Sequence, residues 1–188
     1  MRKASPKYIA LLRGINVGGH NLVPMARLKS IFQACDFEEV QTYLQSGNVV
    51  FQPGSRIDER LLVEKITARL DEAFPFQIKF VLRTAKELSR VISRNPFATR
   101  TGIAKEHLHV VFLANPVATI ETSVLPTAKG EQVIFDGDTI YLHLPFGSGR
   151  SKVNNNWFEK TCGVTATTRN WNTVRALERL ACSGYDAA

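Results

Sequence analysis

The order of predicted strands and helices repeats once along the chain, and this repetition constrains the fold more than any other feature. In the first half, an apolar run ending at Gly14 predicts a buried strand, and a helix is expected to begin at Pro24. Two short strands follow, then a helix capped by Asp58, a fourth strand, and a helix whose start has the capping-box spacing of Thr84 and Glu87. The apolar face of the first helix carries Leu28, Ile31, Phe32 and Cys35.

The second half repeats this order with different residues. A strand is predicted over 107–114, a weak helix over 120–128, and a hairpin around the Asp-Gly-Asp turn at 136–138. A helix that Ser151 could cap and Gly163 would end comes next. A short strand near 165–169 and a last helix complete the repeat.

Both halves therefore have the order β-α-β-β-α-β followed by a further helix, at an offset of about 90–100 residues. This is the order of the ferredoxin-like α/β plait, in which helices cover one face of an antiparallel sheet. A chain of 188 residues can form two compact units of this size. We predict an α+β protein of two tandem plaits, residues 1–100 and residues 101–188.

Charge and cysteine content indicate which kind of partner and which cellular compartment would suit this protein. Residues 1–95 carry 15 basic and 9 acidic side chains, so most of the net charge of +7 lies in the first half. That surplus would suit an anionic partner, although the charges could instead serve only to keep the chain soluble. The three cysteines are widely spaced and form no CxxC, which predicts a reducing cytoplasm. No apolar stretch approaches the ~20 residues of a membrane span, so we expect a soluble protein.

Six stretches of the chain are similar to a known family. They are ALLRGINVGG (10–19), YLQSGNVVF (43–51), NPF (95–97), YLHLP (141–145), GRSK (149–152) and ATTRNWNT (166–173). In this order they closely resemble the bacterial domain-of-unknown-function family 1697. The resemblance implies a pair of α/β plaits and no known activity. One position departs from the family, where a Lys is frequent and this chain has His20, which puts in doubt any role that needs a fixed positive charge there.

A glycine-rich loop follows the first strand. Gly14 and Gly19 have the G-x-x-x-x-G spacing of a phosphate-binding loop, but His20 and Asn21 stand where that loop has its Lys and hydroxyl. The sequence therefore argues against a nucleoside-triphosphatase loop. Two interpretations stay open: backbone N–H groups that hold an anion, and a tight left-handed turn with no ligand.

Hydrogen-bond donors concentrate in turns and at strand ends, with no carboxylate among them. We predict that they line a cleft between the two units that binds a small phosphorylated or nucleotide-like anion, because loops on a rigid sheet can present such groups. The candidate ligand-binding residues are Arg13, Asn16, Gly18, Gly19, Ser46, Asn48, Arg150, Lys152, Arg169, Asn170 and Asn172.

The alternative is a nucleic-acid-binding protein that uses backbone contacts from the basic first half. An RNA-recognition motif would carry stacking aromatic rings on its third strand. The corresponding stretch, 46–51, has aliphatic residues where those rings belong, which argues against base recognition of that kind.

Catalytic and metal-binding patterns are sparse. By strand alternation His107, His109 and His143 could share a sheet face, but no Cys or carboxylate pair completes a zinc site, so we expect no metal. The sequence names no cofactor, no protein partner and no reaction.

Overall fold

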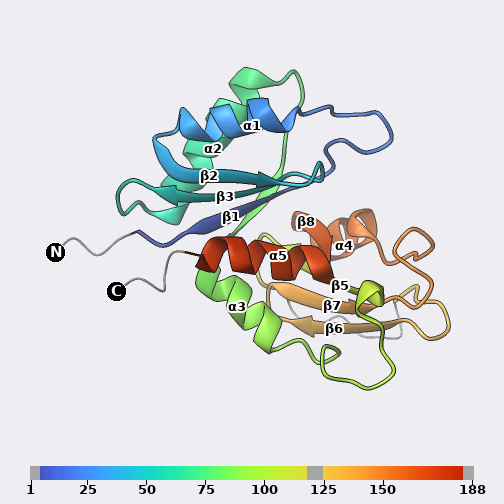
Figure 1. Ribbon diagram of the computed structural model, residues 1–188. Helices are drawn as coiled ribbons and strands as arrows, with labels where there is room; N and C mark the ends of the chain where they lie inside the picture. The colour runs from blue at the N-terminus through green and yellow to red at the C-terminus, as the bar shows by residue number, and fades with distance from the viewer. Residues whose placement is uncertain (1–4, 118–124, 184–188) are drawn as a thin grey trace. The chain divides into compact units, whose positions relative to one another are not determined.

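The computed structural model describes residues 5–117 and 125–183, which form two compact units. Unit 1 comprises residues 5–87 and 177–183, and unit 2 comprises residues 88–117 and 125–176. The sequence predicts a single division near residue 100, whereas residues 88–100 group with unit 2 and the end of the last helix groups with unit 1. Each unit contains one four-stranded antiparallel sheet (Figure 1).

Unit 1 has the element order that the first half predicts. Its sheet has the strand order β2-β3-β1-β4, so the apolar β1 pairs with a neighbour on each side. Helices α1 and α2 cover one face of this sheet (Figure 1). The elements are β1 (Tyr8–Leu12), α1 (Met25–Gln33), β2 (Phe37–Tyr43), β3 (Asn48–Pro53), α2 (Glu59–Ala73), β4 (Phe80–Thr84) and the start of α3 (Ala85–Ser93).

Two predicted helix starts of unit 1 are confirmed. The Asp58 side chain accepts a hydrogen bond from the Arg60 backbone N–H at 2.9 Å, and it caps α2. At α3, Glu87 Oε2 accepts from the Thr84 N–H at 2.8 Å, while Thr84 Oγ1 accepts from the Glu87 N–H at 3.2 Å. This is the reciprocal pattern of a capping box, which satisfies two N–H groups that would otherwise lack partners.

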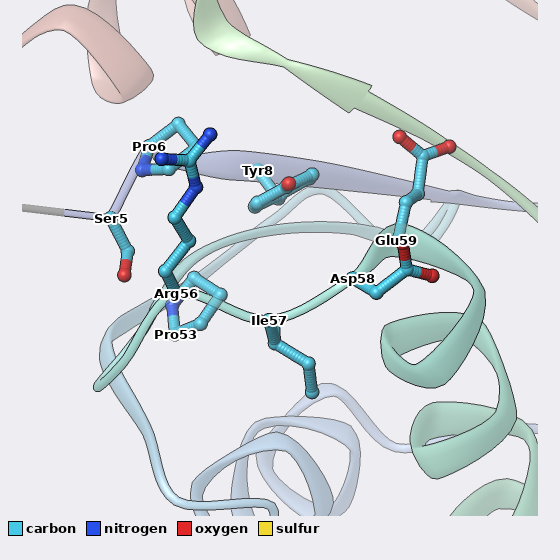
Figure 2. Close-up of a pocket in the computed structure, with 8 residues that line it drawn as sticks. All are labelled: Ser5, Pro6, Tyr8, Pro53, Arg56, Ile57, Asp58 and Glu59. Atoms are coloured by element: carbon cyan, nitrogen blue, oxygen red, sulfur yellow. The ribbon is translucent and has the colours of Figure 1, made fainter.

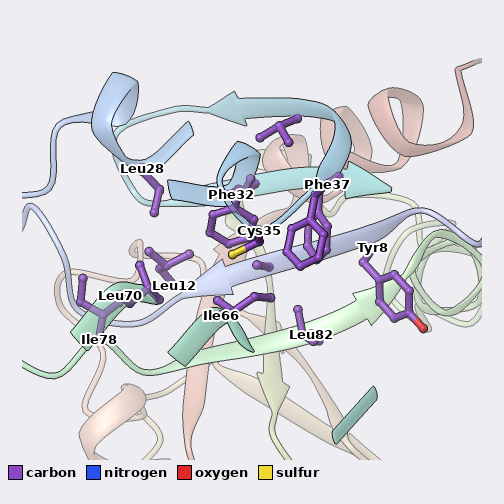
Figure 3. Close-up of a cluster of buried hydrophobic side chains, with 14 of the residues drawn as sticks. Tyr8, Leu12, Leu28, Phe32, Cys35, Phe37, Ile66, Leu70, Ile78 and Leu82 are labelled. Atoms are coloured by element: carbon purple, nitrogen blue, oxygen red, sulfur yellow. The ribbon is translucent and has the colours of Figure 1, made fainter. Parts of the chain in front are cut away.

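The core of unit 1 lies between the sheet and its two helices (Figure 3). Leu28 and Phe32 of α1 and Ile66 of α2 are fully buried, as the helical spacing predicts. Cys35 is also buried, as expected, but it lies in the turn after α1 and not on the helix itself. Burial of this continuous apolar layer is the main stabilising contribution to the unit.

Unit 2 has the strand order β6-β7-β5-β8 and contains the corresponding pattern of pairings. The helix predicted over 120–128 falls largely on residues 118–124, outside the described residues. The elements are α3 from residue 88, a short 3-10 turn at Lys105–His107, β5 (Leu108–Leu113), β6 (Gln132–Asp136), β7 (Thr139–His143), α4 (Asn155–Cys162), β8 (Ala166–Asn170) and α5 (Trp171–Cys182).

Helix α4 covers the face of unit 2 that carries the site described below. Val111 and Leu113 of β5 pack there with Phe158 of α4. The prediction that Ser151 caps this helix is wrong, because Asn154 is the N-cap and its side chain accepts from the Trp157 N–H at 3.1 Å. The predicted end at Gly163 is confirmed by its left-handed φ of 70°.

The described structure is thus an α+β arrangement of two antiparallel sheets with five α-helices. Among the described helices, none has the length and apolar character that a membrane-spanning segment requires.

Candidate functional site

A polar pocket of about 300 Å³ lies in unit 2, where the sheet meets the loop that leads into α4. Its apolar wall comes from Leu142, Leu144 and Val153. The polar side chains that line it are His109, Ser148, Asn154, Asn155, Thr168 and Asn170. No carboxylate of the described residues lines the pocket.

Strand pairing brings the central residues of this pocket together. His109 of β5 is paired with Leu142 of β7 on one side and with Asn170 of β8 on the other. Directly paired residues point to the same face of a sheet, and so do residues two apart on one strand. His109, Asn170 and Thr168 therefore share the face that α4 covers.

His109 is the most constrained polar group of the pocket. Its side chain is only 8% exposed, and Nδ1 has no hydrogen-bond partner among the described residues. Burial lowers the pKa of His109 below 6.5; the polar backbone of His107 partly opposes this shift, and the nearby His107 ring reinforces it. At neutral pH the imidazole is uncharged, and one of its nitrogens is buried without a partner, which costs free energy.

The N-terminus of α4 forms a second wall of the pocket. Asn155 Oδ1 accepts a hydrogen bond from Thr168 Oγ1 at 2.6 Å, which fixes the orientation of the Asn155 amide. The Asn155 Nδ2 group donates to no acceptor in the described parts of the chain. Because the N-terminal turn of a helix carries partial positive charge, this wall favours an anion over a cation.

Three of the predicted unit 2 residues lie at or beside this pocket. Asn170 lines it, and its Oδ1 accepts from the Thr173 N–H at 2.8 Å, which caps α5. Arg150 and Lys152 are exposed in the loop that also contributes Ser148. The loop is tightened by a hydrogen bond from the Ser151 N–H to the Ser148 carbonyl at 3.4 Å.

The other two predicted residues of unit 2 lie elsewhere. Arg169 is paired with Val110, so it points to the sheet face opposite His109. It is buried, and its Nη1 donates to Thr167 Oγ1 at 2.7 Å and to the Thr168 carbonyl at 2.9 Å. Asn172 is exposed in the first turn of α5.

In unit 1, the two predicted asparagines are engaged in holding the fold. Asn16 Nδ2 donates to the Val23 carbonyl at 3.0 Å and to the Gln45 carbonyl at 2.8 Å, which ties the glycine-rich loop to the β2–β3 turn. Asn48 is fully buried and donates to the Tyr43 carbonyl at 2.7 Å and to Ser46 at 3.1 Å. Their amide N–H groups are thus already used within the unit.

The remaining predicted residues of unit 1 surround these two asparagines. Gly18 and Gly19 are exposed, with φ of 58° and 79°, in a turn closed by a hydrogen bond from the His20 N–H to the Val17 carbonyl at 3.0 Å. Of the two interpretations of the glycine-rich loop, this geometry favours the tight left-handed turn. Arg13 is half-buried at the end of β1, and Ser46 is exposed in the β2–β3 turn. The prediction that these residues share one cleft with those of unit 2 stays a prediction.

Several cations of the basic first half form ion pairs. Lys7 Nζ lies 2.7 Å from Glu39 Oε2, and pairs of the same kind join Lys65 to Asp36 and Arg69 to Glu72. Paired cations contribute less to a field that would attract a polyanion. Nucleic-acid binding by this half stays a prediction.

The three histidines do not share one sheet face, which corrects the expectation from alternation. His143 is paired with Leu108, so it points away from the face of His109. His107 lies in the 3-10 turn before β5, and its ring centroid is 6.4 Å from that of His143. Alternation within a strand could not show this, because the register between β5 and β7 decides which face His143 takes.

Sequence reasoning missed four polar lining residues of the pocket: Ser148, Asn154, Asn155 and Thr168. The run of three asparagines at 154–156 is a signal that could have drawn attention to the start of α4, since Asn favours helix N-caps.

Comparison with known proteins assigns the family. Residues 6–141 match the family described as protein of unknown function, DUF1697. The chain belongs to this family. The DUF1697 match ends before the loop that leads into α4, so it covers His109 but not the other polar lining residues.

A solved structure supports the fold of this DUF1697 chain. The structure of the conserved bacterial protein SP0830 from Streptococcus pneumoniae has a TM-score of 0.68 and 23% sequence identity. The similarity covers 94% of this chain and 98% of the other. At this identity the likeness shows the fold alone. A comparison with curated proteins finds no match.

Proposed function

We propose that the protein binds a small phosphorylated ligand in the polar pocket of unit 2. The observation that carries this proposal is His109, a buried neutral imidazole. Within the described part of the chain, one of its nitrogens has no partner and no carboxylate lines its pocket. A polar ligand in the pocket could supply a hydrogen-bond partner to this nitrogen, which would contribute favourable free energy to binding.

The chemistry of the lining residues supports an anion. Asn155 Nδ2, the Ser148 hydroxyl and the helix N-terminus supply neutral donors, and Arg150 and Lys152 supply positive charge from the neighbouring loop. Phosphate oxygens accept hydrogen bonds from such donors and pair well with guanidinium groups.

The size of the pocket limits the ligand. A volume of about 300 Å³ is at the small end of ligand-binding cavities. A sugar phosphate or a mononucleotide that is only partly enclosed suits this volume better than a dinucleotide. The apolar wall of Leu142, Leu144 and Val153 would contact the carbon skeleton of such a ligand.

We further propose that each unit is a ferredoxin-like plait and that the protein functions in the cytoplasm. The order β-α-β-β-α-β of unit 1 and the equivalent sheet orders β2-β3-β1-β4 and β6-β7-β5-β8 support the first point. The free state of Cys35, Cys162 and Cys182 is compatible with a reducing compartment.

Thermal unfolding with inorganic phosphate, ribose 5-phosphate, AMP and unphosphorylated ribose tests ligand binding. A ligand at about 100 times its dissociation constant adds about 2.7 kcal/mol to the free energy of unfolding, so a bound phosphate compound raises the melting temperature and ribose does not. Replacement of Arg150 by Gln should remove one charge-assisted hydrogen bond and weaken binding by about 10-fold or more. Lys160→Gln, an exposed cation at the other end of α4, is the matched control.

The variant His109→Gln separates this proposal from its alternative. If phosphorylated compounds bind in the pocket, this variant loses their stabilising effect. Absence of any shift with all three phosphate compounds contradicts the proposal. Salt-sensitive binding of short oligonucleotides that His109→Gln leaves unchanged would favour the nucleic-acid alternative instead.

A further inference from the structure

Unit 1 contains a second, separate pocket of about 590 Å³ (Figure 2). It lies beside the start of β1 and the connection from β3 to α2. One part of its lining is apolar and consists of Pro6, Pro53, Ile57 and the ring of Tyr8. The other part is charged and consists of Arg56, Asp58 and Glu59.

Tyr8 is the feature of this pocket that the fold does not explain. The residue is only 7% exposed, and its ring is stacked on Phe51 with centroids 6.0 Å apart. Its hydroxyl makes no hydrogen bond with any described residue, although it lines the pocket. Burial, Glu59 and Glu87 raise the pKa of Tyr8 above 10, so the hydroxyl stays protonated and can both donate and accept.

Charges of opposite sign stand on the two sides of Tyr8. In Figure 2 the Arg56 guanidinium lies to one side of the Tyr8 ring and the carboxylates of Asp58 and Glu59 lie to the other. One carboxylate oxygen of Asp58 caps α2 by accepting from the Arg60 N–H. The positive end of the α2 dipole, roughly half a charge, offsets only part of the negative charge of Asp58.

A simple cation or a simple anion would match only one side of this pocket. A molecule with an ammonium group toward Asp58 and a carboxylate toward Arg56 would match both sides. The apolar wall would then contact an apolar side chain, and the Tyr8 hydroxyl would gain a partner.

We infer that this pocket binds a zwitterion of the α-amino-acid type with an apolar side chain, either as a free amino acid or as a short peptide. This inference does not depend on the proposed function. All residues that line the present pocket belong to unit 1, whereas those that line the polar pocket at His109 belong to unit 2.

Three forms of one compound test the inference by isothermal titration calorimetry. L-leucine carries both charges, leucine amide carries only the ammonium, and N-acetyl-leucine carries only the carboxylate. Concentrations up to about 10 mM would detect even millimolar dissociation constants. We expect L-leucine to bind and each singly charged form to bind at least about 10-fold more weakly, since each lacks one charge-assisted contact. The dipeptide leucyl-leucine decides whether a free amino acid or a peptide binds more tightly.

Variants of the lining residues identify the pocket. Asp58→Asn retains a good helix cap but removes the negative charge, and it should weaken L-leucine or dipeptide binding by about 10-fold. Tyr8→Phe retains the ring on Phe51 and should weaken binding by about two- to tenfold. Arg60→Gln, an exposed α2 cation outside the pocket lining, should have no effect.

The inference is overturned if neither L-leucine nor the dipeptide binds, or if the singly charged forms bind equally well. It is also overturned if His109→Gln, but not Asp58→Asn, abolishes leucine binding. If His109→Gln no longer binds phosphate compounds but still binds leucine, the inference is supported. The failure of one proposal can therefore be distinguished from the failure of the other.

Discussion

Replacement of Gly47 by alanine should destabilise unit 1 strongly, for two separate reasons. Gly47 is buried in the β2–β3 turn with a φ of 76°, a conformation that costs an L-residue about 1–2 kcal/mol. A Cβ atom there would lie 2.5 Å from Ile15 Cδ1 and 2.9 Å from Leu12 Cβ. The Ile15 methyl can rotate away, but Leu12 Cβ is attached to the central strand β1. Overpacking of this kind adds about 1–3 kcal/mol.

The predicted loss for Gly47→Ala is therefore about 2–5 kcal/mol in the free energy of unfolding, measured by urea denaturation followed by circular dichroism. Gly14→Ala is the matched control in the same unit, since its φ is 66° and nothing lies within 4 Å of the added Cβ. Gly14→Ala should lose only the conformational cost, about 1–2 kcal/mol. Equal losses in the two variants would refute the claim that the contact with β1 matters.

Three further variants probe buried polar groups. Tyr141→Phe removes the hydroxyl that donates to the Val91 carbonyl at 3.0 Å and should cost about 1–3 kcal/mol in urea denaturation; no loss would contradict a role for this bond. Asn48→Ala, which removes two buried donor contacts, should cost a similar amount, whereas an unchanged denaturation midpoint would show that water replaces them. Burial lowers the pKa of His109, so the unfolded chain takes up a proton below pH 6.5 that the folded chain does not, and stability should fall as the pH decreases from that value. In His109→Gln the free energy of unfolding should decrease less as the pH falls. Burial also lowers the pKa of His143, which contributes to the decrease that remains. The same pH dependence in both proteins would contradict the role given to His109.

Local signals in the sequence predict most of the described elements correctly. The capping box of Thr84 and Glu87 and the cap at Asp58 were predictable because each involves atoms only a few residues apart. The hairpin at 136–138 was predictable for the same reason, since its turn residues determine the geometry. Where two local signals compete, as Ser151 and Asn154 do before α4, the sequence does not show which residue caps the helix.

The candidate site was only partly predictable. The loop with Arg150 and Lys152 and the strand end at Asn170 were identified as donor-rich, and Asn170 lines the pocket. The sequence indicates His109 only as a candidate metal ligand, because its burial and its pairing with Asn170 depend on a strand far away in the chain. The amides of Asn16 and Asn48 looked available in the sequence, but the folded turns occupy them.

By itself, the sequence determined the order of strands and helices, their approximate ends and the apolar faces that form each core, because these depend on short-range spacing and turn chemistry. Only the tertiary structure decided which polar groups are available. The pairing of β5 with β7 and β8 determines that His109 and Asn170 share a face while Arg169 and His143 do not. Packing likewise leaves His109 Nδ1 buried without a hydrogen-bond partner among the described residues. Such properties arise from contacts between residues far apart in the chain, and local residue patterns carry no information about them.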